Sequence, residues 1–187
     1  MIASPGVVRR RGGQNPAYRP ARPHRVPDLV APGIFRRRPP GSYRAGVIIN
    51  VEVDIDRPRD QVFDAMADAR NEPTWNSQVS RTDLLSGEPI GQGTTFTTVN
   101  RGQAYTATIT EYRRADAVTF EVDGRAMVIM GSLTFRDAGS GTHMSGVFDM
   151  RPKGFMKVVL PLMAGAVRKD FPRQMASFKE FCEASAR

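Results

Sequence analysis

Residues 46–187 are predicted to form one α+β domain, in which a curved antiparallel sheet wraps round a long C-terminal helix. Three features of the sequence predict this class. A strand with strictly alternating apolar residues begins at Val47, a series of short strand-like segments follows, and an apolar stripe at helical spacing runs through the last part of the chain.

The first strand covers residues 47–55, where Val47, Ile49, Val51, Val53 and Ile55 alternate with mostly polar residues. This alternation predicts one buried face and one exposed face.

A helix is predicted directly after Arg57-Pro58, because proline suits the first helical turn. Val62, Phe63 and Met66 then recur at helical spacing. Asn71-Glu72-Pro73 ends this helix, and Trp75 is expected on a short second helical segment.

Six more strands are predicted, because turn signals divide the next stretch at intervals of roughly ten residues. Arg101-Gly102 and Asp123-Gly124 are two of these turns, and Asp-Gly is a strong hairpin signal. The predicted strands cover residues 79–85, 94–100, 105–112, 118–122, 127–136 and 142–150. The short links between them indicate an antiparallel meander.

The last segment is predicted to be one helix. Its apolar residues fall three or four positions apart, at Met163, Val167, Phe171, Met175, Phe178 and Cys182. Pro161 is expected near its start, and Pro172 is expected to kink it because proline removes a backbone hydrogen bond.

Residues 1–45 differ sharply from the rest. The chain has 27 Lys and Arg, 19 Asp and Glu, and a formal charge of +8. Ten Arg and a single acid, Asp28, fall in residues 1–45, together with eight of the 14 prolines. The segment is therefore +9 and the remainder is −1, so any argument for nucleic-acid binding concerns the segment alone. Its composition predicts disorder.

Three interpretations of residues 1–45 stay open. The segment is a solvated extension without function, including upstream sequence translated from a misassigned start, since the next methionine is Met66. Alternatively its arginines contact the phosphates of nucleic acid or anionic lipid weakly, or it is a targeting segment.

Several classes of protein are disfavoured. Cys182 is the single cysteine, so no intrachain disulfide forms and an oxidising compartment is not required. No apolar run reaches the roughly 18 residues of a transmembrane span. No metal-ligand spacing and no glycine-rich nucleotide loop occurs, so neither a metal nor a cofactor is expected. The expected location is the cytoplasm.

The order of elements resembles the helix-grip fold of the SRPBCC superfamily, which includes START-domain and polyketide-cyclase-like proteins. The residues that carry the resemblance are Val53-Asp54-Ile55-Asp56-Arg57-Pro58, Asn71-Glu72-Pro73-Thr74-Trp75, Gly91-Gln92-Gly93-Thr94, Thr110-Glu111-Tyr112, Gly141-Thr142 and Pro161-Leu162. The resemblance covers about residues 47–184. It does not include the basic segment or Pro172.

The resemblance implies a cavity between sheet and helix for a small hydrophobic ligand. Strand alternation and the helical stripe then predict which side chains face it. They are Trp75, Phe96, Tyr105, Ile109, Phe120, Met127, Ile129, Phe135, Met144, Phe148, Met150, Met163, Val167 and Phe171. Gly131 and Gly146 are expected to leave room beside them.

Candidates for catalysis are few. Tyr105, Glu111 and Asp149 are the residues considered, because a carboxyl group in an apolar pocket has a raised pKa and moves protons. For Glu111 the favoured interpretation is an exposed strand residue that faces water and pairs with a neighbouring arginine. His143 alternates out of phase with Met144 and is expected to point outward.

Two functions follow from the resemblance, and a third from the basic segment. The first is binding of a lipid- or polyketide-like molecule, and the second is a cyclase or dehydratase acting on such a molecule. The third is a regulatory module with a nucleic-acid-contacting arm.

Overall fold

The computed structural model describes residues 46–184, and the predictions for residues 1–45 lie outside this range. The elements are β1 Val47–Ile55, α1 Arg59–Ala67, the 3-10 helix η1 Ala69–Asn71, α2 Glu72–Trp75, β2 Val79–Leu84, β3 Thr95–Asn100, β4 Gln103–Arg113, β5 Ala117–Gly124, β6 Met127–Ala138, β7 Gly141–Pro152 and α3 Met156–Ala184. This is the predicted order, so the α+β class and the helix-grip architecture are confirmed.

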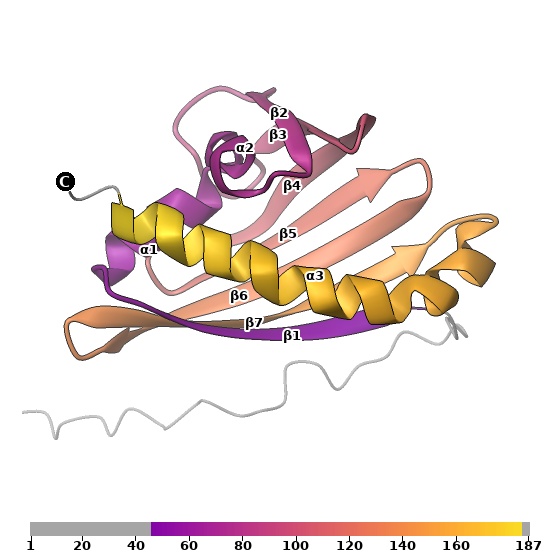
Figure 1. The fold of residues 1–187 in the computed structure, drawn as a ribbon. Helices are drawn as coiled ribbons and strands as arrows, with labels where there is room; N and C mark the ends of the chain where they lie inside the picture. Colours follow the sequence, from indigo (N-terminus) through magenta and orange to yellow (C-terminus); the bar gives the residue numbers. More distant parts are fainter. Residues whose placement is uncertain (1–45, 185–187) are drawn as a thin grey trace, which may run out of the picture. The chain divides into compact units, whose positions relative to one another are not determined.

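The strands form one antiparallel sheet in the order β1-β7-β6-β5-β4-β3-β2. The first and last strands lie side by side, with Val51 opposite Gly146, while the others follow the chain. A twisted sheet of seven strands curls, because the twist between neighbouring strands accumulates. In Figure 1 the sheet curves behind α3, which runs along its concave face.

The β3–β4 hairpin turns at Arg101 and Gly102, both with positive φ (49° and 75°), as predicted. The β5–β6 turn differs from the prediction, because Gly124 remains in β5 and pairs with Tyr105. A Cβ atom at Gly124 would lie 2.3 Å from the Tyr105 ring. Gly124 therefore accommodates an aromatic ring within the sheet, and the chain turns after it.

Helix α3 is longer than predicted at its N-terminal end. It begins at Met156, so Pro161 lies inside the helix and not near its start, whereas Pro172 lies inside it as expected. The turn that precedes it is tied to the β5–β6 connection, since the Lys153 backbone N–H donates to the Ala126 carbonyl at 2.7 Å.

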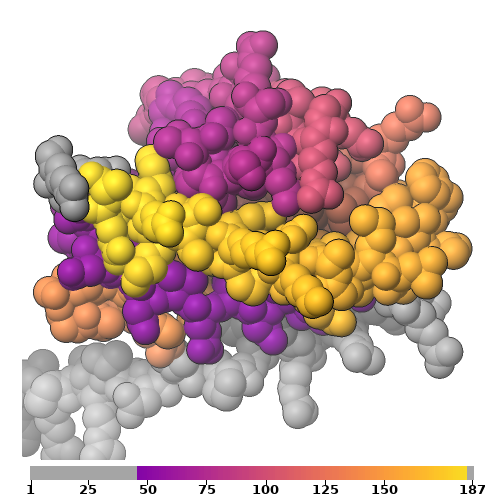
Figure 2. Space-filling model, viewed as in Figure 1, coloured from indigo at the N-terminus to yellow at the C-terminus, as the bar shows by residue number. Residues whose placement is uncertain are grey.

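One half of the interior is densely packed. Phe63 of α1 meets Tyr112 and Phe135 edge to face, with ring centroids 5.1 and 5.2 Å apart. Phe178, from the C-terminal half of α3, is fully buried in the same hydrophobic core. In the space-filling view the yellow C-terminal part of α3 lies at the surface and closely borders the indigo and magenta segments on either side of it (Figure 2).

Candidate functional site

The other half of the interior contains a cavity of about 860 Å³ between α3 and the sheet. This volume falls in the range of small-molecule sites, roughly 300–1,000 Å³. Most of the predicted residues line it. They are Trp75, Phe96, Tyr105, Ile109, Phe120, Met127, Ile129, Phe148, Met150, Met163, Val167 and Phe171. That any of them contacts a ligand stays a prediction.

Two predicted residues, Phe135 and Met144, do not line the cavity. They lie opposite each other on β6 and β7 and are almost completely buried. Their positions fall at the end of the sheet that α1 covers, where Phe63 packs on Phe135. Strand alternation predicts that both side chains point inward. It does not predict at which positions along the sheet other side chains fill the interior.

Gly131 and Gly146 do not create the space that the sequence suggested. A Cβ atom at Gly131 would lie 2.4 Å from the Phe120 ring, and one at Gly146 would lie 2.3 Å from the Ser132 carbonyl oxygen and 2.5 Å from Leu133. These glycines are needed because neighbouring groups already occupy the adjacent space. Phe120 thereby rests on the sheet and forms part of the cavity wall.

Aromatic rings continue this wall from the sheet onto α3. Phe148 lies between Phe120, at a centroid distance of 5.9 Å, and Phe171, at 4.5 Å. Because Phe171 belongs to the helix, the row joins the two sides of the cavity. The resulting surface is broad, apolar and able to contact a flat or aliphatic molecule by dispersion.

The candidate acids Glu111 and Asp149 lie outside the cavity. A bulge between Ile109 and Glu111 shifts the register of β4, so Glu111 turns outward and its carboxylate pairs with Arg113 at 2.9 Å. Asp149 alternates with the inward Phe148 and pairs with Arg151 at 2.7 Å. Neither carboxylate lines the cavity, so this placement does not support a catalytic role for either residue, and that role stays a prediction.

Tyr105 is the one catalytic candidate that lines the cavity. Its ring covers Gly124. His143 points outward, as predicted, and its Nδ1 atom lies 2.7 Å from an Asp54 carboxylate oxygen.

A polar group that the sequence analysis missed stands in the cavity wall. Glu72 of α2 lines the cavity and accepts a hydrogen bond of 3.0 Å from Asn76 Nδ2. The Asn76 Oδ1 atom accepts from the Gln78 backbone N–H at 3.2 Å, which fixes the orientation of the amide. Burial raises the pKa of the Glu72 carboxyl group above its ordinary value, and the Asn76 hydrogen bond lowers it in part.

Trp75 adds a hydrogen-bond donor to the same wall. Its ring meets Phe178 edge to face, with centroids 5.2 Å apart. The Nε1 atom is buried and is the one buried side-chain nitrogen or oxygen within residues 46–184 that has no hydrogen-bond partner. Buried indole N–H groups normally find an acceptor. The α2 segment therefore contributes a carboxyl group to the cavity wall, together with a tryptophan whose buried N–H donor has no partner.

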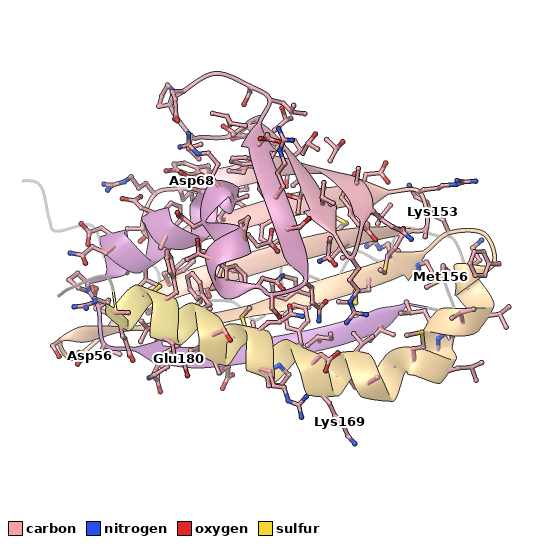
Figure 3. All side chains as sticks on the ribbon, turned by 45° about the horizontal axis from the view of Figure 1, so that its top comes forward. Asp56, Asp68, Lys153, Met156, Lys169 and Glu180 are labelled. Atoms are coloured by element: carbon pink, nitrogen blue, oxygen red, sulfur yellow. The ribbon has the colours of Figure 1, made fainter. Side chains whose placement is uncertain are left out.

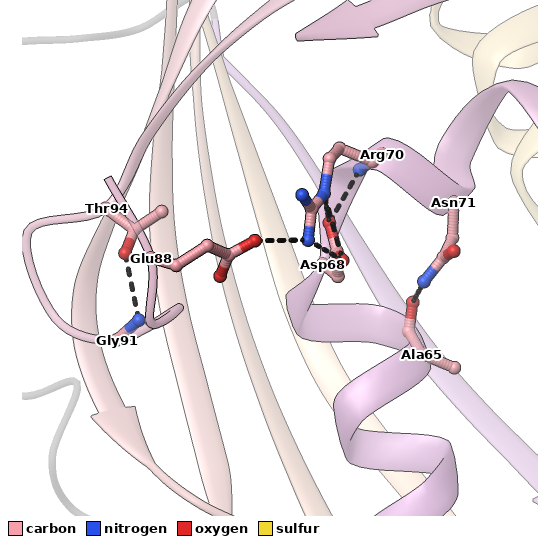
Figure 4. Close-up of polar contacts among 7 residues, drawn as sticks. All are labelled: Ala65, Asp68, Arg70, Asn71, Glu88, Gly91 and Thr94. Carbon is pink, nitrogen blue, oxygen red and sulfur yellow. Dashed lines mark hydrogen bonds and ion pairs between the residues drawn. The ribbon is translucent and has the colours of Figure 1, made fainter. Parts of the chain in front are cut away.

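Polar contacts hold this segment in place (Figure 4). The Asp68 carboxylate accepts from the Arg70 backbone N–H at 3.1 Å and caps η1. The Arg70 guanidinium bridges Asp68 at 2.7 Å and Glu88 of the β2–β3 loop at 2.8 Å. Asn71 Nδ2 donates to the Ala65 carbonyl at 3.1 Å, which ties η1 back to α1. These contacts fix the start of α2 and hence the positions of Glu72 and Trp75.

An exposed ion pair crosses the cavity rim. Arg101, on the β3–β4 turn, lies 3.7 Å from Asp170 of α3, and both residues line the cavity. The Arg101 backbone N–H also donates to the Gln78 carbonyl at 2.8 Å. Both charged side chains are largely exposed, so the pair adds little stability and opens at low cost.

The sequence contains a signal for Glu72 and Asn76, namely Pro73. From the sequence alone, Asn71-Glu72-Pro73 is predicted to end one helix. Proline at the first positions of a helix equally begins a new one, and positions 72, 75 and 76 then share a face.

Two structural features are absent from residues 46–184. No cluster of His, Cys, Asp and Glu in this range has the arrangement of a metal site. No helix in the same range has both the length and the hydrophobicity needed to cross a bilayer.

Comparison with known proteins identifies the family. The family model described as "Polyketide cyclase / dehydrase and lipid transport" matches residues 47–183. The chain belongs to this family. It is thus a member of the SRPBCC superfamily, as the resemblance implied. No curated protein matches it significantly.

Solved structures with low sequence identity share the fold. A START superfamily protein from Mycobacterium smegmatis aligns with a TM-score of 0.62 at 11% identity, covering 75% of this chain and 99% of that one. A protein from Thermus thermophilus aligns with a TM-score of 0.63 at 16% identity, covering 75% and 99%. The di-domain ARO/CYC protein BexL, from the BE-7585A biosynthetic pathway, aligns with a TM-score of 0.56 at 15% identity, covering 76% of this chain and 51% of that one.

Proposed function

We propose that this family member binds a small hydrophobic ligand, lipid- or polyketide-like, that carries one polar group. The observation that carries the proposal is the cavity of about 860 Å³, with its aromatic wall and its polar group at α2. The apolar body of the ligand would contact the row formed by Phe120, Phe148 and Phe171. Its polar group would accept a hydrogen bond from Trp75 Nε1 and face the Glu72 carboxyl group.

The cavity supports useful affinity. Burial of about 300 Å² of apolar ligand surface contributes roughly 7 kcal/mol at about 25 cal/mol/Å². Association and side-chain ordering offset part of this. Dissociation constants of several micromolar or weaker are therefore the scale expected, since 1 μM corresponds to about 8 kcal/mol.

Native mass spectrometry of the protein purified from its own host tests the proposal. The expected spectrum contains a complex with a non-covalent molecule of a few hundred daltons. Ala107→Trp narrows the cavity because Ala107 lines it, whereas Thr106→Trp places the same ring on the exposed face of β4. The complex should weaken in the first variant and persist in the second. Equal retention in both would place the molecule elsewhere on the protein.

A second candidate function, a cyclase or dehydratase, is favoured by Glu72. A carboxyl group with a raised pKa inside a cavity is suited to transfer protons to or from a bound substrate. Glu72→Gln should then abolish turnover of a polyketide-like substrate by orders of magnitude while ligand affinity changes little. Glu111→Gln and Asp149→Asn are the matched controls, because both carboxylates lie outside the cavity. Full activity in Glu72→Gln would exclude this role.

The remaining expectations stay predictions. A cytoplasmic location is consistent with a chain that needs no disulfide. A nucleic-acid-contacting role of residues 1–45 predicts salt-sensitive binding that disappears when those residues are removed.

A further inference from the structure

Large apolar side chains protrude where α3 begins. Phe155, Val158 and Leu162 are 75, 71 and 84% exposed, more than any other large hydrophobic residue in the described part of the chain. Val158 and Leu162 are four residues apart and share one helix face. We call these three residues the apolar ridge. Scattered apolar side chains are ordinary on a surface, but a contiguous exposed group marks an interaction site.

The ridge points away from the core. The same helix buries Leu160 and Phe171 against the sheet, and these positions lie on the side opposite Leu162 at 100° per residue. Folding of residues 46–184 therefore does not cover the ridge. Three exposed apolar residues at the start of α3 and in the turn before it cost solubility unless something else covers them.

Positive charge lies beside the ridge and farther along α3. No acidic residue occurs in residues 150–169, although this stretch contains five Lys and Arg. Lys153 pairs with Asp123 and Arg151 with Asp149, but none of Lys157, Arg168 and Lys169 has an ion-pair partner among residues 46–184. Figure 3 shows Lys169 extending from α3 away from the sheet, and places Met156 and Lys153 together at the other end of this stretch.

The ridge also borders the cavity. Phe155 is highly exposed and yet lines the cavity, as do Gly154, Met156 and Arg125 of the adjoining turns. The cavity thus reaches the surface at the ridge. A surface in contact with the ridge would lie next to this opening.

We propose that the apolar ridge docks the protein on an anionic membrane surface. Apolar side chains that enter the interface, with cations at the level of the headgroups, are the features of a helix that lies on a bilayer. A second copy of the chain fits less well, because a two-fold contact brings the same patch against itself and so brings together two sets of the unpaired cations Lys157, Arg168 and Lys169. This docking goes beyond the proposed ligand binding and does not depend on it.

Site-specific fluorescence on the full-length chain tests the proposal. Leu162→Cys and Leu85→Cys are each labelled with an environment-sensitive fluorophore, while native Cys182 is buried and resists labelling. Leu85 is a matched control, since it is 59% exposed and belongs to the β2–β3 connection. Phosphatidylcholine vesicles with and without phosphatidylglycerol are added. The expected result is a blue shift at position 162 on the anionic vesicles and none at position 85.

Partitioning of unlabelled variants gives the second measurement. Phe155→Ser with Val158→Ser should weaken sedimentation with anionic vesicles by about a hundredfold, since each buried side chain contributes about a factor of ten. Leu85→Ser should leave it unchanged, and melting temperatures report that both variants fold.

Three outcomes would overturn the proposal. The arginines of residues 1–45 are expected to attract anionic vesicles by themselves. Vesicle binding without a fluorescence shift at position 162 would therefore assign the binding to that segment alone. Vesicle binding that the ridge substitutions do not weaken would lead to the same conclusion. A shift at position 162 that follows protein concentration without vesicles, with dimers in light scattering, would assign the ridge to a second copy.

Discussion

Truncation of two phenylalanines on α3 distinguishes a hollow interior from a packed one. Phe171 and Phe178 are both buried, at 8 and 0% exposure, and belong to the same helix. Phe171 lines the cavity and contacts Phe148, whereas Phe178 lies in the core against Trp75 and does not line the cavity. The same substitution therefore removes a half-contacted ring at one site and a fully contacted ring at the other.

The expected losses in the free energy of unfolding follow from these contacts. Phe→Ala in a packed core costs about 3–5 kcal/mol, and Phe178→Ala should fall at about 4–5 kcal/mol because its ring is completely enclosed. A ring with one face toward empty space makes about half as many dispersion contacts, so Phe171→Ala should cost about 2–3 kcal/mol.

Urea unfolding of the two variants and the parent chain measures the difference. A difference of about 2 kcal/mol between the variants separates their midpoints by about 1 M at the usual slopes of 1–3 kcal/mol/M. Losses that agree within about 0.5 kcal/mol would mean that Phe171 is packed on all sides, and the reasoning from a hollow interior would be refuted.

Three further predictions concern ionisable groups. Because burial raises the pKa of Glu72 above 4.5, its ionisation costs stability as pH rises above about 4.5 and through the raised pKa. Glu72→Gln should therefore gain in unfolding free energy relative to the parent between pH 4 and pH 8 in urea titrations, and a constant difference would contradict the shift. Burial raises the pKa of Cys182 to about 12, so iodoacetamide at pH 8 should modify it in urea but hardly in the folded protein, as mass spectrometry would report. Arg57 donates to the Cys182 carbonyl at 2.9 Å and to the Glu183 carbonyl, so Arg57→Gln should lower the unfolding free energy by about 1–2 kcal/mol, and an unchanged urea midpoint would show that this cap is dispensable.

The sequence predicts the architecture well because its signals are local and repeated. Alternation along β1 and the stripe on α3 each report which side of an element is buried, and turn residues report where strands end. The turn at Arg101-Gly102 is predicted correctly because Gly102 takes a positive φ, which glycine adopts without strain. Asp123-Gly124 fails because Gly124 serves the packing of Tyr105, a contact between strands that a local pattern does not contain.

The site is predicted less completely because a cavity is a property of packing. Alternation gives the inward direction of Phe135 and Phe148 equally, yet α1 fills the space at the first and not at the second. The bulge that turns Glu111 outward has no clear sequence signature. Glu72 is missed because its role depends on a four-residue helix that begins at Glu72-Pro73, which the sequence analysis interprets as a break.

Energy transfer from the single tryptophan to an apolar fluorescent probe tests the hollow interior most directly. Trp75 lines the cavity, so a naphthylamine probe bound inside would lie within a few ångströms of the indole. We predict transfer that saturates at a fixed probe-to-protein ratio, with micromolar affinity, and that falls in Ala107→Phe, whose ring narrows the space without adding a second tryptophan. Transfer that never saturates, or none at all, would contradict an interior open to a guest molecule.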